Sequence, residues 1–133
     1  MTGLDLQLLA GTYAVSRLSP GEPAPEWARG ELLAMVWTPE ELSIVSAADS
    51  VPASIRSERG WRVLRVVGPL DFSLVGILAT LAGALARASV ALFSLSTFDT
   101  DYLFVREHDL QLALRALESD GHRVATEGEA RPE

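Results

Sequence analysis

The chain has 133 residues, of which 48% are hydrophobic, and 11 basic and 18 acidic residues give it a formal net charge of −7. This composition predicts one compact globular domain, or two very small halves that share a core, and it excludes a disordered chain. The acidic balance and the scattered arginines argue against a nucleic-acid partner, and the absence of cysteine excludes disulfides, thiolate nucleophiles and cysteine metal sites.

Two segments bear on location. The longest apolar stretch, Leu74–Ala88, includes Thr80 and Arg87 and falls short of the ~20 residues that span a bilayer. The segment Met1–Gly11 lacks the basic start of a secretory signal peptide. We therefore expect no membrane association and a cytoplasmic location.

The first half of the chain reads as short strands separated by loops. Three prolines between Ser19 and Pro25 deny that segment both a strand ladder and a helix interior. One helical turn is expected at Glu26–Arg29, and a loop with a short helix at Ala48–Glu58. Alternating apolar and polar residues predict the strands, which are Leu4–Leu9, Tyr13–Leu18, Leu32–Trp37 and Glu41–Val45.

The second half shows a more regular order of elements. Leucines at helical spacing predict one helix over Leu74–Ala88 and another over Glu107–Ser119, the second ending before Gly121. The expected strands are Trp61–Val67, Val90–Ser96, Asp101–Arg106 and His122–Ala125. The order β-α-β-β-α-β predicts an α+β fold of the ferredoxin-like type.

The first half follows a similar order with reduced helices, so it reads as a degenerate copy of the second. We therefore predict two tandem halves, residues 1–59 and 60–125, followed by a flexible tail over residues 126–133. This inference rests on the order of the elements alone.

No catalytic motif is present in the sequence. A nucleophile elbow, a P-loop, an H-E-x-x-H pair and a dinucleotide-binding glycine motif are all absent. The two histidines, His108 and His122, are expected at opposite ends of the second helix as solvated residues. We expect a protein that is not an enzyme and that needs no cofactor or metal.

The start of the first helix is one half of a candidate ligand site. Ser73 or Asp71 is placed to cap this helix, and Gly76 is expected in its first turn, where glycine costs about 1 kcal/mol relative to alanine. Close approach of a ligand or of another chain would explain the glycine. Free amides over Leu74–Gly76, with the positive end of the helix dipole behind them, would suit a carboxylate.

The hairpin near residue 100 is the other half. Ser96, Thr97, Asp99 and Asp101 gather polar groups beside two apolar strands. A free amino acid needs donors for its carboxylate and an acidic acceptor for its ammonium. We hypothesise that the helix start binds the carboxylate and that Asp71, Asp99 or Asp101 binds the ammonium.

A local structural explanation is the alternative. Asp71 and Ser73 would then only cap the helix, while Asp99 and Asp101 would only shape a turn. Gly76 would serve close packing on a neighbouring element. The residues alone leave both explanations open.

Several segments carry a family resemblance: YAVSRL, ELSIVSAADSVP, ERGWRVLRVVGPLDFSLVGILATLA and SLSTFDTDYLFVRE. Over about Tyr13 to His122 the chain resembles ACT-domain proteins, specifically the small bacterial two-ACT proteins related to the CASTOR arginine sensors. The resemblance implies two ACT-like halves in a regulatory protein that binds an amino-acid-like molecule at a domain or subunit interface, and a homodimer. It places the ligand near the first strand-to-helix loop and the hairpin, which here contain Asp71, Phe72, Ser73, Gly76, Ile77, Ser96, Thr97, Asp99 and Asp101. The alternative is an interaction or dimerisation module that binds no ligand.

Overall fold

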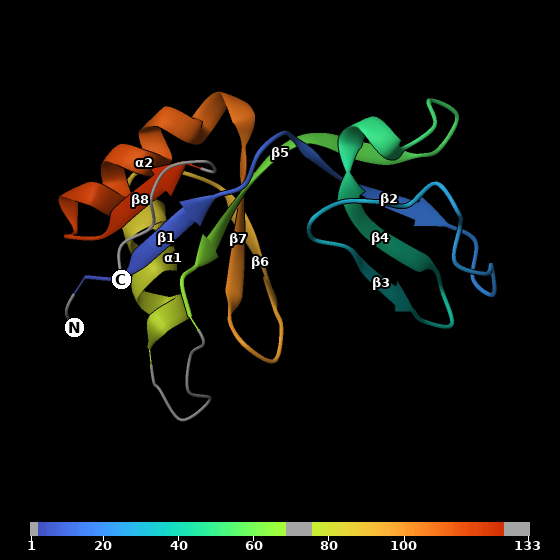
Figure 1. Cartoon of the computed structure of the whole chain (residues 1–133), viewed down its shortest axis with the longest axis horizontal. Helices are drawn as coiled ribbons and strands as arrows, with labels where there is room; N and C mark the ends of the chain where they lie inside the picture. The colour runs from blue at the N-terminus through green and yellow to red at the C-terminus, as the bar shows by residue number, and fades with distance from the viewer. Residues whose placement is uncertain (1–2, 69–75, 127–133) are drawn as a thin grey trace. The chain divides into compact units, whose positions relative to one another are not determined.

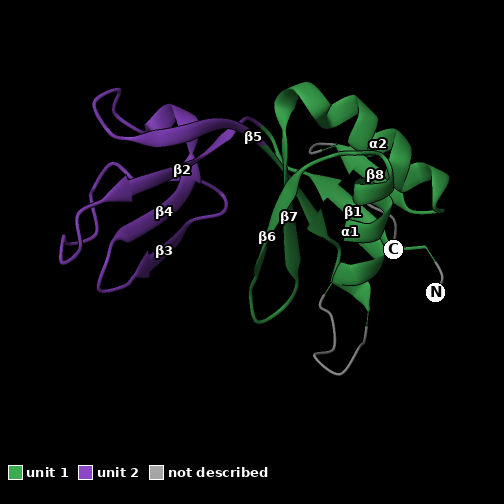
Figure 2. Ribbon diagram, turned by 180° about the vertical axis from the view of Figure 1, so that it is seen from behind, with its two compact units in different colours: residues 1–10, 62–133 green, residues 11–61 purple. Residues whose placement is uncertain are grey.

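The computed structural model describes residues 3–68 and 76–126. The chain forms two compact units, of which unit 2 is Gly11–Trp61 and unit 1 combines Met1–Ala10 with Arg62–Glu133 (Figure 2). Strand β5, Ser57–Val66, begins in unit 2 and continues into unit 1. Within the described ranges, no helix is long and apolar enough to cross a membrane.

Unit 1 has the predicted β-α-β-β-α-β order, so the expected α+β, ferredoxin-like arrangement is confirmed. The chain runs from β5 through α1, two strands, a short 3-10 turn and α2 to a last strand. Their bounds are α1 Ile77–Arg87, β6 Leu92–Ser96, β7 Asp101–Arg106, the 3-10 turn η2 Glu107–Asp109, α2 Leu110–Ser119 and β8 Arg123–Thr126.

The first strand of the chain, β1 (Asp5–Leu8), also belongs to the unit 1 sheet. It lies between β5, to which it is antiparallel, and β8, to which it is parallel. With β7 on the other side of β5 and β6 beyond it, the strand order is β8-β1-β5-β7-β6. The compact units thus group β1 with the C-terminal part of the chain. The division into two tandem ACT-like halves, residues 1–59 and 60–125, remains a prediction.

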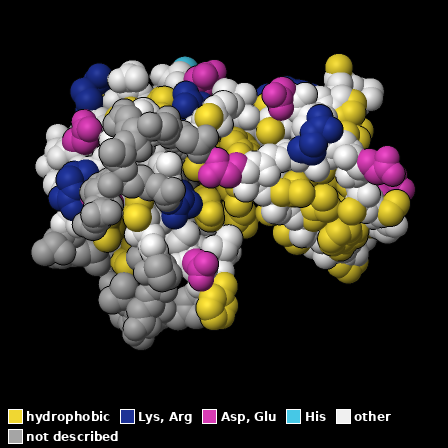
Figure 3. All heavy atoms as spheres, in the orientation of Figure 1, with side chains coloured by type: hydrophobic (Ala, Val, Ile, Leu, Met, Phe, Trp, Pro, Cys, Tyr) yellow, Lys and Arg dark blue, Asp and Glu magenta, His cyan; other side chains and the backbone are white. Residues whose placement is uncertain are grey.

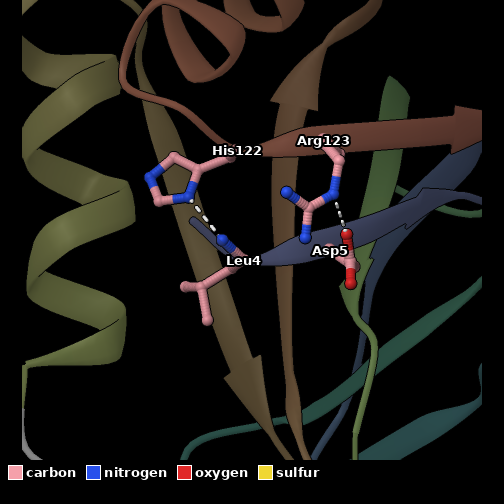
Figure 4. A network of polar contacts seen from close by, with 4 residues as sticks. All are labelled: Leu4, Asp5, His122 and Arg123. Atoms are coloured by element: carbon pink, nitrogen blue, oxygen red, sulfur yellow. Dashed lines mark hydrogen bonds and ion pairs between the residues drawn. The ribbon is translucent and has the colours of Figure 1, made fainter. Parts of the chain in front are cut away.

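Two polar contacts connect the residues at the beginning of β1 with those at the beginning of β8 (Figure 4). The Leu4 amide donates to Nδ1 of His122 over 3.0 Å, and Nε of Arg123 donates to the Asp5 carboxylate over 2.6 Å. His122 is only 4% exposed, so its predicted solvation is wrong. The side chain of His108, by contrast, is 78% exposed, as expected.

The core of unit 1 lies between one face of its sheet and the two helices (Figure 1). Strand alternation turns Leu6 and Leu8 of β1 toward the helices, and helical periodicity turns Leu81 and Leu85 of α1 toward the sheet. Further buried members of this cluster are Leu64, Val66, Ile77, Ala84, Val90, Leu103, Val105, Leu110, Ala113 and Leu117. Burial of these apolar side chains is the main stabilising contribution to unit 1.

Unit 2 is an antiparallel sheet in the order β3-β4-β2-β5. Its other strands are β2 Tyr13–Leu18, β3 Ala34–Trp37 and β4 Leu42–Ala47, followed by the 3-10 turn η1, Ala48–Ser50. A small cluster of Ala14, Ala48 and Val51 packs against Trp27 and Ile55. The segment predicted as one helical turn, Glu26–Arg29, forms a turn at residues 26 and 27 and no helix.

Candidate ligand-binding site

The topology of unit 1 brings the end of β5, the start of α1 and the β6–β7 turn to the same end of the sheet (Figures 1 and 2). Because α1 runs back along the sheet, β6 repeats the direction of β5, so the turn that follows β6 lies where β5 ends. A hydrogen bond fixes this arrangement: Oγ1 of Thr100 donates to the carbonyl of Val66 over 2.6 Å. Thr100 is 5% exposed, so this bond is shielded from water.

At the start of α1, Gly76 is the N-cap residue, with φ +87° and ψ 4°, and the helix proper begins at Ile77. The predicted place of Gly76 inside the first turn is therefore wrong, because a left-handed backbone cannot continue a right-handed helix. No described heavy atom would lie within 4 Å of a Cβ at Gly76, so the positive φ, rather than close packing within the chain, accounts for the glycine.

At the start of α1, three backbone donors have no acceptor within the helix. The first intrahelical bond runs from the Thr80 amide to the Gly76 carbonyl, and no side chain among residues 3–68 and 76–126 caps the helix. The amides of Ile77, Leu78 and Ala79 therefore precede the first bonded donor. Of the amides expected to be free at Leu74–Gly76, those of Leu74 and Val75 lie outside the described residues, and the side chain of Ile77 is buried in the core.

The turn between β6 and β7 uses its polar side chains mainly on itself. Ser96 donates to the Asp101 carboxylate over 2.5 Å. Oγ1 of Thr97 donates to the Thr100 carbonyl and accepts from the Thr100 amide, at 3.2 and 3.3 Å. Asp99 is exposed and makes no hydrogen bond or ion pair with a described residue. The local turn-shaping role weighed for these residues is thus seen in the hydrogen bonds of Ser96, Thr97 and Asp101.

The predicted site residues divide into two groups. Gly76, Ser96, Thr97, Asp99 and Asp101 lie at the same end of unit 1, with Ile77 contributing its amide (Figure 1). Three predicted residues, Asp71, Phe72 and Ser73, lie outside the described residues. The sequence analysis did not identify Thr100. Its place in a short hairpin, where threonine side chains often form hydrogen bonds, was the only signal in the sequence.

Metal binding receives no support from the described part of the chain. Within residues 3–68 and 76–126, no group of three or more His, Asp or Glu side chains comes together in a way that could hold an ion. The polar groups gathered at this end of unit 1 are backbone amides, hydroxyls and two carboxylates. These groups bind organic ions through hydrogen bonds.

Comparisons with known proteins agree with this arrangement. The ACT domain profile matches residues 56–119, and the profile of a separate N-terminal domain family matches residues 11–54. The human cytosolic arginine sensor for mTORC1 subunit 1 is 37% identical over 59 residues, which make up 44% of this chain and only 18% of that protein. This chain therefore corresponds to a small part of the sensor.

Solved structures extend the similarity to the whole chain. An Agrobacterium tumefaciens protein is 33% identical, with a TM-score of 0.89 and 100% of both chains covered. The regulatory subunit of aspartate kinase from Thermus thermophilus shares the fold, with a TM-score of 0.60 at 15% identity over 86% of this chain. With the ferredoxin-like order of unit 1, the profile match over β5 to α2 and a full-length relative, the chain belongs to the ACT-domain family.

Proposed function

We propose that this protein is a non-catalytic regulatory protein that binds an amino acid at the end of unit 1 where α1 begins. The free amides of Ile77–Ala79 would bind the carboxylate, and Asp99 or Asp101 would bind the ammonium. A neighbouring domain or the second subunit of a homodimer would complete the site. Downstream, the occupied state would be recognised by another protein.

One observation carries this proposal: the Thr100 to Val66 hydrogen bond holds the acidic turn at the end of β5, the strand that leads toward α1. A carboxylate at a helix start is stabilised by the amides and by the helix dipole. The acidic side chains of the turn supply the complementary charge for an ammonium. The arginine-sensing name of the partial relative supports an amino acid as the ligand class.

A thermal-shift screen of the full chain against the common L-amino acids tests this. An amino acid at ~100 times its dissociation constant should stabilise the folded protein by about 2.7 kcal/mol, which raises the melting temperature by several degrees. If no amino acid changes the melting temperature, the ligand-binding proposal fails.

Two variants locate the site. Asp99→Asn should weaken binding roughly fivefold, because the exposed carboxylate contributes about 1 kcal/mol to an ammonium contact. Asp109→Asn is the matched control, since this aspartate precedes α2 and should leave the affinity unchanged. Equal affinity of wild type and Asp99→Asn, measured by calorimetry, would remove Asp99 from the site.

A second candidate function is an interaction module that pairs subunits without a ligand. The local hydrogen bonds of Ser96, Thr97 and Asp101 favour it, because these groups are already partly satisfied. Apolar side chains also remain on the β3 strand, where Val36 is 51% and Trp37 52% exposed, and Figure 3 shows hydrophobic side chains over this part of unit 2. Native mass spectrometry separates the two functions, because it reports the subunit number and any retained small molecule together.

A further inference from the structure

Unit 2 contains a pocket of about 220 Å³ at the strands β4 and β2 and the start of β5. At ~30 Å³ per water molecule this is the volume of about seven waters, which leaves room for a small amino acid. Its lining includes Val15 and Arg17 of β2, Ser43 of β4 and Glu58 of β5, together with Glu41 and Arg56, which directly precede β4 and β5.

Strand register explains why these side chains meet. Val15 pairs with Glu58 on β5, and Arg17 pairs with Ser43 on β4. The Arg17 amide also donates to the Arg56 carbonyl over 3.0 Å, which sets these two arginines side by side. Directly opposed residues in an antiparallel sheet share a face, and residues two apart on one strand share it too. The six side chains therefore line one face of the sheet.

Two like charges stand next to each other in this pocket. Arg17 and Arg56 are neighbours on adjacent strands, an arrangement that is unfavourable unless an anion lies between the guanidinium groups. Nη2 of Arg17 donates to the Glu40 carbonyl over 2.9 Å, which orients that side chain. The Arg56 residue is exposed, and its side chain makes no hydrogen bond or ion pair with a described residue. It can offer two parallel N–H donors to a carboxylate.

The acidic residues of the pocket set the rest of the ligand. On the same face of the sheet, Glu58 lies two residues after Arg56 and pairs with Val15. Glu41 lies two residues before Ser43, which pairs with Arg17, so the two glutamates lie on opposite sides of the arginine pair. Two arginines and two glutamates give the pocket no net charge. A simple anion would be attracted by the arginines and repelled by the glutamates, whereas a molecule that carries both charges is attracted by both kinds of side chain.

We propose that this pocket is a second small-molecule site that binds a zwitterion, with its carboxylate on Arg56 and Arg17 and its ammonium on Glu58 or Glu41. The site lies entirely within unit 2. It does not depend on the amino-acid site proposed for unit 1, and either one can exist without the other.

Solution NMR of the ¹⁵N-labelled full chain tests this with three probes: glycine, acetate and methylammonium. Glycine should shift the amides of residues 15–17, 41–43 and 56–58, and should reach half-saturation at a lower concentration than either singly charged probe. If acetate binds as tightly as glycine, the glutamates have no role and the zwitterion proposal is overturned. If none of the probes shifts these amides, the pocket binds no such ligand.

The variant Arg56→Gln removes the charge and leaves a shorter, neutral side chain that can still donate from its amide. We expect it to weaken glycine binding about two- to fivefold, the range for an exposed ion pair. The matched control is Arg115→Gln, an exposed arginine on α2 in unit 1, which should leave the affinity unchanged. Equal affinities in wild type and Arg56→Gln would overturn the assignment. Shifts confined to residues 76–79 and 97–101 would report the unit 1 site alone and would also overturn it.

Discussion

The backbone at Gly76 makes a prediction that distinguishes conformational strain from packing. In Gly76→Ala, the methyl group meets no described atom within 4 Å, so its effect arises from the φ of +87°. A left-handed conformation costs an L-residue about 1–2 kcal/mol. The stiffer unfolded chain of the alanine variant returns about 0.4–1 kcal/mol. The net result is a loss of roughly 1 kcal/mol in the free energy of unfolding.

Gly83 supplies the matched control because it lies inside α1. A Cβ there would meet only the flexible end of Arg87, at 3.4 Å. Gly83→Ala should therefore stabilise the protein by about 0.5–1 kcal/mol, as alanine does in a helix interior. The same chemical change thus has opposite signs at the two glycines. Gly76→Asn should fall between wild type and Gly76→Ala, because asparagine tolerates the left-handed region.

Urea unfolding followed by circular dichroism measures these differences. With a slope of about 2 kcal/mol per molar urea, Gly76→Ala should lower the midpoint by roughly 0.5 M and Gly83→Ala should raise it by a similar or smaller amount. If Gly76→Ala is as stable as wild type while Gly83→Ala is stabilised, the start of α1 is not left-handed. The assignment of the free amides to Ile77–Ala79 would then be wrong as well.

Three further predictions concern the contacts within unit 1. His122→Leu should destabilise the protein by about 1–2 kcal/mol in urea unfolding, because the partly buried Leu4 amide that precedes β1 loses its acceptor, whereas His108→Gln should stay within about 0.5 kcal/mol of wild type. Thr100→Val should cost about 1 kcal/mol and should speed amide hydrogen exchange in the β6–β7 turn; unchanged exchange would show that its bond does not hold the turn. The hydrogen bond and the charge of Asp5 raise the pKa of Arg123 above its ordinary value. The contribution of this ion pair to the stability of the folded protein is therefore fully present at any pH below the ordinary pKa of arginine, and it is lost only as the pH rises through the raised pKa. The stability difference between wild type and Arg123→Gln should therefore stay constant from about pH 6 to pH 10, and a decrease within that window would contradict the assignment.

Local sequence patterns predicted most elements of the fold. Two strands, Tyr13–Leu18 and Asp101–Arg106, begin and end where alternation placed them. The α1 helix begins three residues later than its leucine spacing suggests, since periodicity does not register the positive φ of a glycine. Strand β5 extends back to Ser57, because pairing with β2 orders residues that read as loop in isolation.

The sequence did not indicate which strands pair with each other in the sheet. The β1 strand has a clear apolar alternation, but nothing in Leu4–Leu9 indicates that it lies between β5 and β8. Burial of His122 follows from that same placement, because its acceptor role exists only when the Leu4 amide is beside it. A histidine after a helix therefore reads as solvated until the neighbouring strand is known.

The candidate site in unit 1 could be located because its segments lie next to regular elements with recognisable ends. The pocket in unit 2 could not, since Arg17 and Arg56 are separated by a loop, two strands and a turn and meet only through strand pairing. Their individual positions in the sequence resemble ordinary solvated arginines. Only the register of three strands makes them a pair.

The position of β1 in the sheet affects the order in which the two units can fold during synthesis. Unit 2 is a continuous segment, Gly11–Trp61, so all of its residues leave the ribosome before the strands β6, β7 and β8 of unit 1 do. Strand β1 precedes unit 2 in the chain, yet its parallel partner β8 follows unit 2, and Leu4 and His122 are 118 positions apart. Contacts of such long range form slowly. Unit 2 can thus fold during synthesis while the edge of β1 that pairs with β8 is still unpaired. The sheet of unit 1 is complete only after β8 has left the ribosome.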